Sequence, residues 1–444
     1  MRLALFLLVL VSIARIQFVF PVLLPLRLAL LSLAVATGFA VLSPNAVAWK
    51  NVFATWMGVA MGAYGFATIV SAFAGISLGA SATYLIEEFS RTLVATFIFL
   101  AGIRDARDLW FFLWAYVISM GSWAYLSFFY FETTSEGSQV DRLSDLYTYD
   151  ANDLGVVLLM GVAFIFMVLP AASKWVRRGL WVLLVSVVGT LALTGSRGAF
   201  LGAGVLAVFM LFTLHDVQVW KRVATAFAMV LALLIAAPEG YWDQMSTILE
   251  PSDDYNVTDV DGRWQILKRG VTYVVDHPVF GVGPENFGRA EYNNPEKRAM
   301  VPFRTGIRMV SPHNTYLQVA AELGLVGLGI WLYILGRGFF ESYGLRKRLP
   351  KQWKTGSQEE RFLYATGYFF PVAFIGFAVP STFVSFAYSA PPFILFAYYG
   401  AYLRVLEDRF KEDRRQARRR GVIPPHSQAG APGGHPQRLP PPTR

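Results

Sequence analysis

Three short motifs carry the side chains with the strongest chemistry in this sequence: LTGSRGAF around Arg197, GRW at Arg263 and SPHN at His313. An arginine guanidinium stays charged and presents a fork that binds phosphate oxygens in pairs. A histidine, with an ordinary pKa of about 6.5, takes a proton at neutral pH and can serve as a general base. Together they suit a reaction in which a phosphorylated group leaves while a hydroxyl loses its proton.

Each of the three residues also has a simpler structural interpretation. Arg197 could extend from a helix end to the membrane surface, Arg263 could be a surface charge on an interfacial helix, and His313 could cap a helix. Against this, Arg197 lies in a very short turn beside Gly198, with no carboxylate next to it, and charges at membrane depth are costly and tend to be functional. Ser311 or Asn314 would cap a helix better than a histidine, so His313 needs another role.

The elements that must position these residues read as membrane helices. The chain has 444 residues, of which 55% are hydrophobic and 16% charged, against about 25% charged in soluble domains, and its mean hydropathy is +0.44. A membrane crossing needs about 20 mostly apolar residues. The candidate segments are 3–20, 26–43, 52–76, 84–103, 108–131, 153–171, 179–195, 197–214, 221–238, 314–336, 362–379 and 384–404. We therefore expect an all-α polytopic membrane protein with about twelve transmembrane helices.

The first apolar segment is interrupted by Arg15 and Gln17. A cleaved signal peptide over Met1–Ala14 is the competing interpretation. Because no clear small-x-small cleavage site follows the apolar core, we predict an uncleaved first helix.

The lysines and arginines of the connections predict which side of the membrane each one faces. With twelve helices, the basic connections all fall on one side, where they hold Arg104, Arg107, Lys174, Arg177, Arg178, Lys221, Arg222, Arg346, Lys347, Arg348, Lys351 and Lys354. Both termini are then inside, and this pattern accounts for most of the net charge of +9. Arg15 and Arg27 fit the pattern poorly and suggest a short interfacial segment. We expect the arginine run after residue 404 to contact anionic lipid headgroups rather than nucleic acid.

The predicted layout has four parts: helices one to nine in residues 1–238, a long outer loop in 239–312, helices ten to twelve in 313–405, and a basic, Pro/Gly-rich disordered tail in 406–444. Long loops are uncommon unless they are functional. Apolar residues at helical spacing predict an amphipathic helix over Arg263–Asp276, which ends before Pro278 and could lie on the membrane surface. Those apolar residues are Trp264, Leu267, Val271, Val274 and Val275.

All three chemical motifs fall on the outer side of this layout. Gly281 and Gly283 lie near them in sequence and permit an unusual backbone. We find no metal-ligand spacing and no nucleotide loop, so we expect no metal and no cofactor. Asp259-Val260-Asp261 is a weak metal motif, and the acidic residues Asp253, Asp254, Asp259 and Asp261 indicate a solvated loop. The chain has no cysteine, which excludes thiolate chemistry.

These motifs resemble, in order and spacing, the shared domain of the O-antigen ligase and O-antigen polymerase superfamily. The resemblance covers LTGSRGAF, GRWQILKRGVTYVVDHPVFGVGPENF and SPHNTYLQVAAELGLVGLGIWLYIL, over about residues 180–336, and YDANDLG at 149–155 resembles an upstream stretch. Each motif alone is weak, but three together on one face are fairly specific. The resemblance implies a bacterial integral membrane glycosyltransferase of the C type, metal-independent and inverting, with a periplasmic site.

The resemblance also implies roles for individual residues. Arg197 and Arg263 would contact the pyrophosphate of an undecaprenyl-pyrophosphate-linked glycan donor, and His313 would be the base. Asn314 would support the histidine. The residues that would shape the backbone around the substrate are Gly195, Ser196, Gly281 and Gly283.

The acceptor stays open between members of the superfamily. A ligase transfers the glycan to lipid A-core and a polymerase to another lipid-linked repeat. The single long outer loop and the compact length favour a ligase, although 132–152 could be a small second loop of the polymerase kind. A protein glycosyltransferase would usually have a longer C-terminal extension. A transporter, with Arg91 lining a path, is disfavoured because the halves show no repeat. We expect an inner-membrane protein with cytoplasmic termini, in contact with membrane lipids.

Overall fold

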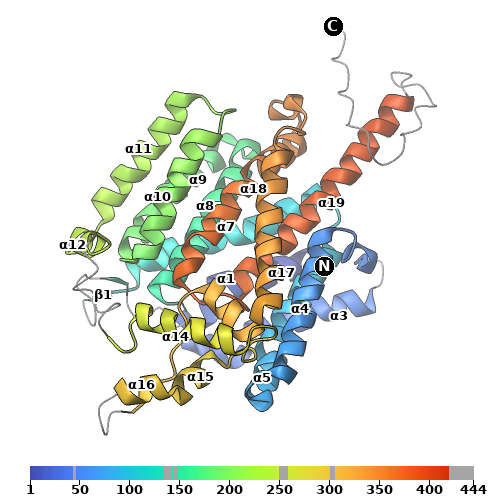
Figure 1. Cartoon of the computed structure of the whole chain (residues 1–444). Helices are drawn as coiled ribbons and strands as arrows, with labels where there is room; N and C mark the ends of the chain where they lie inside the picture. Colours follow the sequence, from blue (N-terminus) through green and yellow to red (C-terminus); the bar gives the residue numbers. More distant parts are fainter. Residues whose placement is uncertain (44–46, 135–141, 144–148, 250–258, 301–305, 420–444) are drawn as a thin grey trace.

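A computed structural model describes residues 1–43, 47–134, 142–143, 149–249, 259–300 and 306–419. Within these ranges the regular secondary structure is helical except for one short antiparallel strand pair, β1 (Thr133–Thr134) and β2 (Arg142–Leu143). Eight helices of the described chain are long and apolar enough to cross a membrane. The structure therefore agrees with the prediction of an all-α polytopic membrane protein (Figure 1).

The α-helices are α1 (Arg2–Ala14), α2 (Ile16–Val19), α3 (Leu28–Leu42), α4 (Trp56–Ala74), α5 (Leu78–Tyr84), α6 (Ser90–Gly102), α7 (Ala106–Phe129), α8 (Ala151–Val168), α9 (Lys174–Leu193), α10 (Arg197–Thr213), α11 (Val219–Ala236), α12 (Tyr241–Ser246), α14 (Arg263–Asp276), α15 (Phe287–Asn293), α16 (Pro295–Met300), α17 (Thr315–Leu345), α18 (Gln358–Ala378) and α19 (Ala390–Arg419). The short 3-10 helices are η1 (Pro21–Leu26), η3 (Trp49–Asn51), η5 (Leu169–Ala171), η7 (Lys351–Lys354) and η8 (Pro380–Phe383). A π-helical turn, η4 (Leu85–Phe89), joins α5 to α6. Most of the chain is thus regular helix.

Each of the twelve predicted segments coincides with one or more of these helices, but twelve membrane crossings are not confirmed. Among the described residues, eight helices reach the required length, and α1 and α10 are shorter apolar helices. The segment predicted at 3–20 is divided, because Arg15 adopts a left-handed backbone (φ 48°) between α1 and α2. The segment predicted at 84–103 belongs to a longer helical run that begins at Leu78.

The centre of the bundle is α8, which packs most extensively against α18 and also against α7, α9 and α10. Its apolar residues surround the whole helix, and such a helix is stable only when it is buried on all sides. Small residues allow the close approach, as is usual between membrane helices. A Cβ added at Gly376 of α18 would lie 2.8 Å from the carbonyl oxygen of Leu159, and one at Gly155 would lie 2.6 Å from Cβ of Ala199.

The segment between α11 and α17, which we call the connecting segment (residues 239–312), gathers at one end of the bundle. Figure 1 shows α14 lying across this end, with α15 and α16 below it and α12 at the lower end of α11, while α19 extends towards the opposite end. The helix predicted over Arg263–Asp276 is confirmed as α14. We call this end of the bundle the site end, because the predicted site residues lie there.

The face that α14 buries differs from the predicted apolar stripe. Trp264, Val271 and Val275 are exposed, whereas Arg269 and Tyr273 are buried. The buried face is mixed: Ile266 joins an apolar cluster with Phe287 and Leu317, against which Leu267 and Val274 of the predicted stripe also pack, while Arg269 meets charged partners from α15 and α16. The exposed stripe leaves an apolar surface on the other side of α14, of the kind that a helix at a membrane surface presents.

Two other predictions concern the ends of the described chain and its surface. Arg91 does not line an interior path: its side chain is half exposed on α6 and lies 3.5 Å from the Glu88 carboxylate. The disordered tail was expected from residue 406, but α19 continues to Arg419. The remainder of that tail lies outside the described residues.

Candidate functional site

The turn between α9 and α10 presents Arg197. Gly195 adopts φ 55°, in the left-handed region that favours glycine, and this reverses the chain within a few residues. Ser196 is the N-cap of α10: its Oγ accepts a hydrogen bond from the backbone N–H of Ala199 and donates one of 2.7 Å to Oδ1 of Asn152. Gln244 Nε2 donates to the carbonyl oxygen of Gly195 at 2.8 Å. The turn is therefore held from both sides.

Arg197 is the first residue of α10, and its Nη1 donates a hydrogen bond of 2.7 Å to Oγ1 of Thr247. Arg263 is likewise the first residue of α14. The N-terminus of a helix carries partial positive charge, so a cation there costs stability and an anion is favoured. Two arginines at two helix N-termini therefore concentrate positive potential of the kind that binds a multiply charged anion.

His313 lies at the junction of the connecting segment and α17. Its backbone is left-handed (φ 46°), which is uncommon for a residue with a Cβ, and its Nε2 is 3.2 Å from Oγ of Ser311. Asn314 is the N-cap of α17, since its Oδ1 accepts hydrogen bonds of 3.0 Å from the N–H groups of Tyr316 and Leu317. Of the two residues predicted to cap better than His313, Ser311 and Asn314, the cap is Asn314, and the imidazole is left for another role.

The surroundings of His313 favour the neutral imidazole. Burial lowers the pKa of His313 below its ordinary value, the positive charge of Arg263 lowers it further, and the negative charge of Asp150 acts in the opposite direction. The helix that begins at Arg263 packs on the first turn of α17, since a Cβ added at Gly270 would lie 2.7 Å from Leu317. A neutral imidazole at pH 7 is the form that accepts a proton.

The stretch after η8 joins the turns that carry Arg197 and His313. Gly198, next to Arg197, packs so closely on η8 that an added Cβ would lie 2.7 Å from Phe383. Thr315, two residues after His313, donates from its Oγ1 to the carbonyl oxygen of Val384 at 2.8 Å. The two turns are therefore attached to neighbouring residues of one short stretch.

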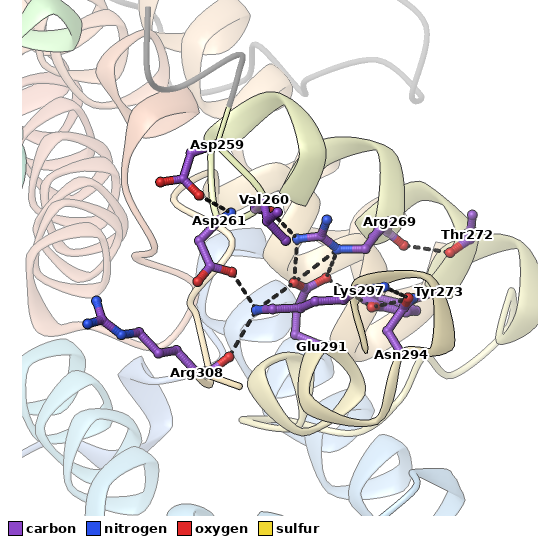
Figure 2. Close-up of polar contacts among 10 residues, drawn as sticks. All are labelled: Asp259, Val260, Asp261, Arg269, Thr272, Tyr273, Glu291, Asn294, Lys297 and Arg308. Atoms are coloured by element: carbon purple, nitrogen blue, oxygen red, sulfur yellow. Dashed lines mark hydrogen bonds and ion pairs between the residues drawn. The ribbon is translucent and has the colours of Figure 1, made fainter. Parts of the chain in front are cut away.

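A buried polar cluster, which we call the Glu291 cluster, holds the connecting segment together (Figure 2). Arg269 of α14 forms a forked pair with the Glu291 carboxylate, with its Nη2 2.8 Å and its Nε 3.0 Å from the two oxygens. Tyr273 donates its hydroxyl to the same carboxylate at 2.9 Å, and Lys297 Nζ lies 3.4 Å from it. Arg269, Glu291 and Lys297 are almost completely buried, so each charge depends on its partners.

The Glu291 cluster also holds the chain on both sides of the site. Lys297 Nζ lies 2.6 Å from Oδ1 of Asp261, two residues before Arg263, and donates 2.9 Å to the carbonyl oxygen of Arg308, five residues before His313. Figure 2 shows the Asp261 carboxylate and the Arg308 carbonyl oxygen contacting the same Lys297 ammonium group. The cluster therefore couples the position of the start of α14 to that of the irregular segment from Arg308 to His313.

We predicted that Asp261 belongs to a solvated acidic loop, and this prediction is wrong for Asp261. Its carboxylate forms an ion pair with the buried Lys297. Asp259 accepts a hydrogen bond from the N–H of Asp261, and Asp253 and Asp254 lie outside the described residues. Among the residues that the structure describes, no three histidine, aspartate or glutamate side chains lie together as a metal-ligand group.

Ser196, Asn314, Gly281 and Gly283 have structural positions. Ser196 and Asn314 cap helices, as described above. Gly281 and Gly283 adopt φ 71° and 97°, as their residue type suggested, and bring the connecting segment onto α17 through a hydrogen bond of 3.0 Å from the N–H of Gly283 to the carbonyl oxygen of Glu322. This contact is more than two helical turns beyond Asn314, since a turn takes about 3.6 residues.

The structure also adds residues that the sequence did not single out. Asp150 reaches the surroundings of His313, Asn152 binds Ser196, and Thr247 binds Arg197. Asp150 and Asp153 form a capping box at the start of α8, which explains part of the YDANDLG motif. That capping pattern was visible in the sequence, but the partners of Thr247 and Asn152 lie 44 or more residues away.

Comparison with known proteins agrees with this arrangement. Residues 181–332 match the family model described as O-antigen ligase, a stretch that contains Arg197, Arg263 and His313. A stretch of 170 residues is 25% identical to an uncharacterized protein of Haemophilus influenzae and covers 36% of this chain and 42% of that protein. The chain thus matches less than half the length of this relative. The resemblance expected from the three motifs is confirmed over residues 181–332, which are similar to the O-antigen ligase family.

Proposed function

We propose that this protein is a membrane glycosyltransferase that moves a glycan from undecaprenyl pyrophosphate to an acceptor hydroxyl, with lipid A-core as the acceptor. The observation that carries the proposal is the packing of α14, which begins at Arg263, against the start of α17, which follows His313. A base and a phosphate-binding cation at one place are what transfer from a glycosyl pyrophosphate needs.

In the proposed step, the imidazole of His313 takes the proton of the acceptor hydroxyl while its oxygen bonds to the anomeric carbon of the donor sugar. The bond from that carbon to the pyrophosphate oxygen breaks, and the electron pair leaves with undecaprenyl pyrophosphate. Arg197 and Arg263 bind the pyrophosphate and stabilise the charge that grows on it. Attack opposite the leaving group inverts the anomeric centre, and the step uses neither metal nor cofactor.

The same proposal places the site end in the periplasm, with both termini in the cytoplasm of a bacterial inner membrane. The support is the positive-inside rule. Lys174, Arg177 and Arg178 lie at the start of α9, which is about 30 Å long at about 1.5 Å per residue and ends beside the Arg197 turn. The basic residues are thus at the end opposite the site.

Transfer by purified protein in detergent tests this function. The donor is an undecaprenyl-pyrophosphate-linked glycan, EDTA is present, and lipid A-core and a second lipid-linked repeat are offered separately. We expect a larger product on lipid A-core. A ladder on the lipid carrier would instead identify a polymerase, and transfer only after EDTA is omitted would contradict the metal-independent mechanism. No transfer to either acceptor, with donor binding intact, would contradict the ligase proposal.

A further inference from the structure

An apolar groove of about 550 Å³ lies between the start of the chain and helices α7 and α9. Its walls include Ile16 of α2, Phe20 before η1, Ile118 and Gly121 of α7, and Leu183 of α9. Its volume falls within the range of about 300–1,000 Å³ typical of ligand pockets. The groove extends along α7 to Leu126, close to the end of that helix that leads into the residues before α8.

Arg15 stands immediately before Ile16, at one boundary of this groove. Its guanidinium lies over the ring of Tyr149 at 4.0 Å. Tyr149 in turn packs against Trp123 of α7 at 5.4 Å, and Trp123 donates its Nε1–H to the carbonyl oxygen of Ile13. These contacts hold the cation of Arg15 beside the groove, in a left-handed backbone that a residue with a Cβ adopts only at a cost.

The same contacts connect the groove to the candidate site. Tyr149 precedes Asp150, whose charge acts on His313, and Asn152 binds Ser196 next to Arg197. Arg15 therefore contacts Tyr149, three residues before Asn152, which binds the turn that carries Arg197.

We propose that the groove holds the part of the donor's isoprenoid chain nearest its phosphates, and that Arg15 binds the phosphate as the donor enters. The inference rests on the proposed function and adds a chain-binding subsite to it. An apolar groove alone would suit any acyl chain of the bilayer. A groove with an arginine next to its wall residue Ile16 matches a ligand with a long apolar chain and an anionic head.

The test of the groove uses binding rather than transfer, with undecaprenyl pyrophosphate as the probe and native mass spectrometry of the purified chain as the measurement. Gly121→Leu should fill the groove from within, because an added Cβ meets only Leu183, at 3.8 Å. We expect binding about tenfold weaker, since contact with roughly two methylene groups is lost. Ile118→Trp, from an exposed position on α7, should act in the same direction. Gly204→Leu, at another open helical glycine, is the matched control.

The test of the cation compares Arg15→Gln with Arg27→Gln, because both arginines adopt left-handed backbones at helix ends. We expect Arg15→Gln to weaken undecaprenyl pyrophosphate binding about tenfold, as the loss of one charge-assisted hydrogen bond does, and to leave undecaprenol binding unchanged. Arg27→Gln should match the wild-type chain for both probes.

If Gly121→Leu and Ile118→Trp bind undecaprenyl pyrophosphate as tightly as the wild-type chain, the groove does not hold the donor's isoprenoid chain. It would then be a groove that bilayer lipid fills. If Arg15→Gln weakens the binding of undecaprenol as much as that of undecaprenyl pyrophosphate, Arg15 does not bind the phosphate. Failure of the proposed function looks different, because the wild-type chain would then bind undecaprenyl pyrophosphate and transfer no glycan.

Discussion

The helix bundle and the connecting segment are held together by different forces. In the bundle, α8 and α18 meet through apolar side chains and glycines, with no charge needed at the contact between Gly376 and Leu159. In the connecting segment, α14 meets α15 through an apolar cluster that includes Ile266 and Phe287, and it meets α15 and α16 through the buried Glu291 cluster. The connecting segment therefore depends on completed ion pairs as well as on apolar packing. The candidate site lies where the two meet, so its geometry depends on both.

The largest effect should follow from breaking the Glu291 cluster. Glu291→Gln leaves Arg269 and Lys297 buried without their shared carboxylate, and the loss of one partner of a buried ion pair costs about 3–5 kcal/mol. We expect limited proteolysis to cut the connecting segment much faster. Glu296→Gln, an exposed glutamate of α16, is the control. Equal protease resistance of the two variants would show that the cluster does not hold the segment.

A smaller effect should follow from overpacking the bundle. Gly376→Leu forces a side chain against the backbone of Leu159, and overpacking of this kind costs about 1–3 kcal/mol. We expect a lower temperature of thermal unfolding in detergent but unchanged proteolysis of the connecting segment. Gly329→Leu, at an open position of α17, should leave both unchanged. Increased cutting of the connecting segment in Gly376→Leu would mean that the two regions do not act separately.

The smallest expected effect is a shift in the pH dependence of glycan transfer, which depends on His313 at the boundary between the bundle and the connecting segment. Arg263 lowers the pKa of His313 and Asp150 raises it. Transfer by a neutral base falls as pH drops through the pKa of His313, so Arg263→Gln should move this acidic limb to higher pH and Asp150→Asn should move it to lower pH, each by up to about one unit. The limb is read from kcat/KM against pH.

Arg289→Gln, an exposed arginine of α15, is the control for this shift. The position of the limb is read independently of the rate, which Arg263→Gln should also reduce. Limbs that move in the same direction in both variants would contradict the electrostatic assignment.

The sequence allowed most of the helices to be predicted, because apolar runs and helix ends are local properties. The limits of α14 were correct for this reason: apolar spacing marks its length, and Pro278 follows its end. Its buried face was not predictable, because Arg269 is buried by Glu291, which is 22 residues away. A periodicity analysis treats a buried charge as an exposed one.

The candidate site, like α14, was predictable in its residue types and not in its contacts. The residue types of Arg197, Arg263 and His313, and the outer position of their motifs, were enough to group them. The residues that hold them, such as Thr247 and Asp150, depend on distant contacts that have no sequence pattern. Arg15 was assigned only to an interfacial segment, because its neighbour Tyr149 is 134 positions away in the chain.

The most direct test of the central claim is the rate of glycan transfer by His313→Gln, measured with donor binding in the same preparation. His277→Gln, at the end of α14, is the matched histidine control. The account predicts that His313→Gln binds the donor normally and transfers about 10²–10⁴-fold more slowly, the usual contribution of a general base, while His277→Gln transfers at the wild-type rate. Transfer by His313→Gln at the wild-type rate would contradict the claim that this imidazole is the base.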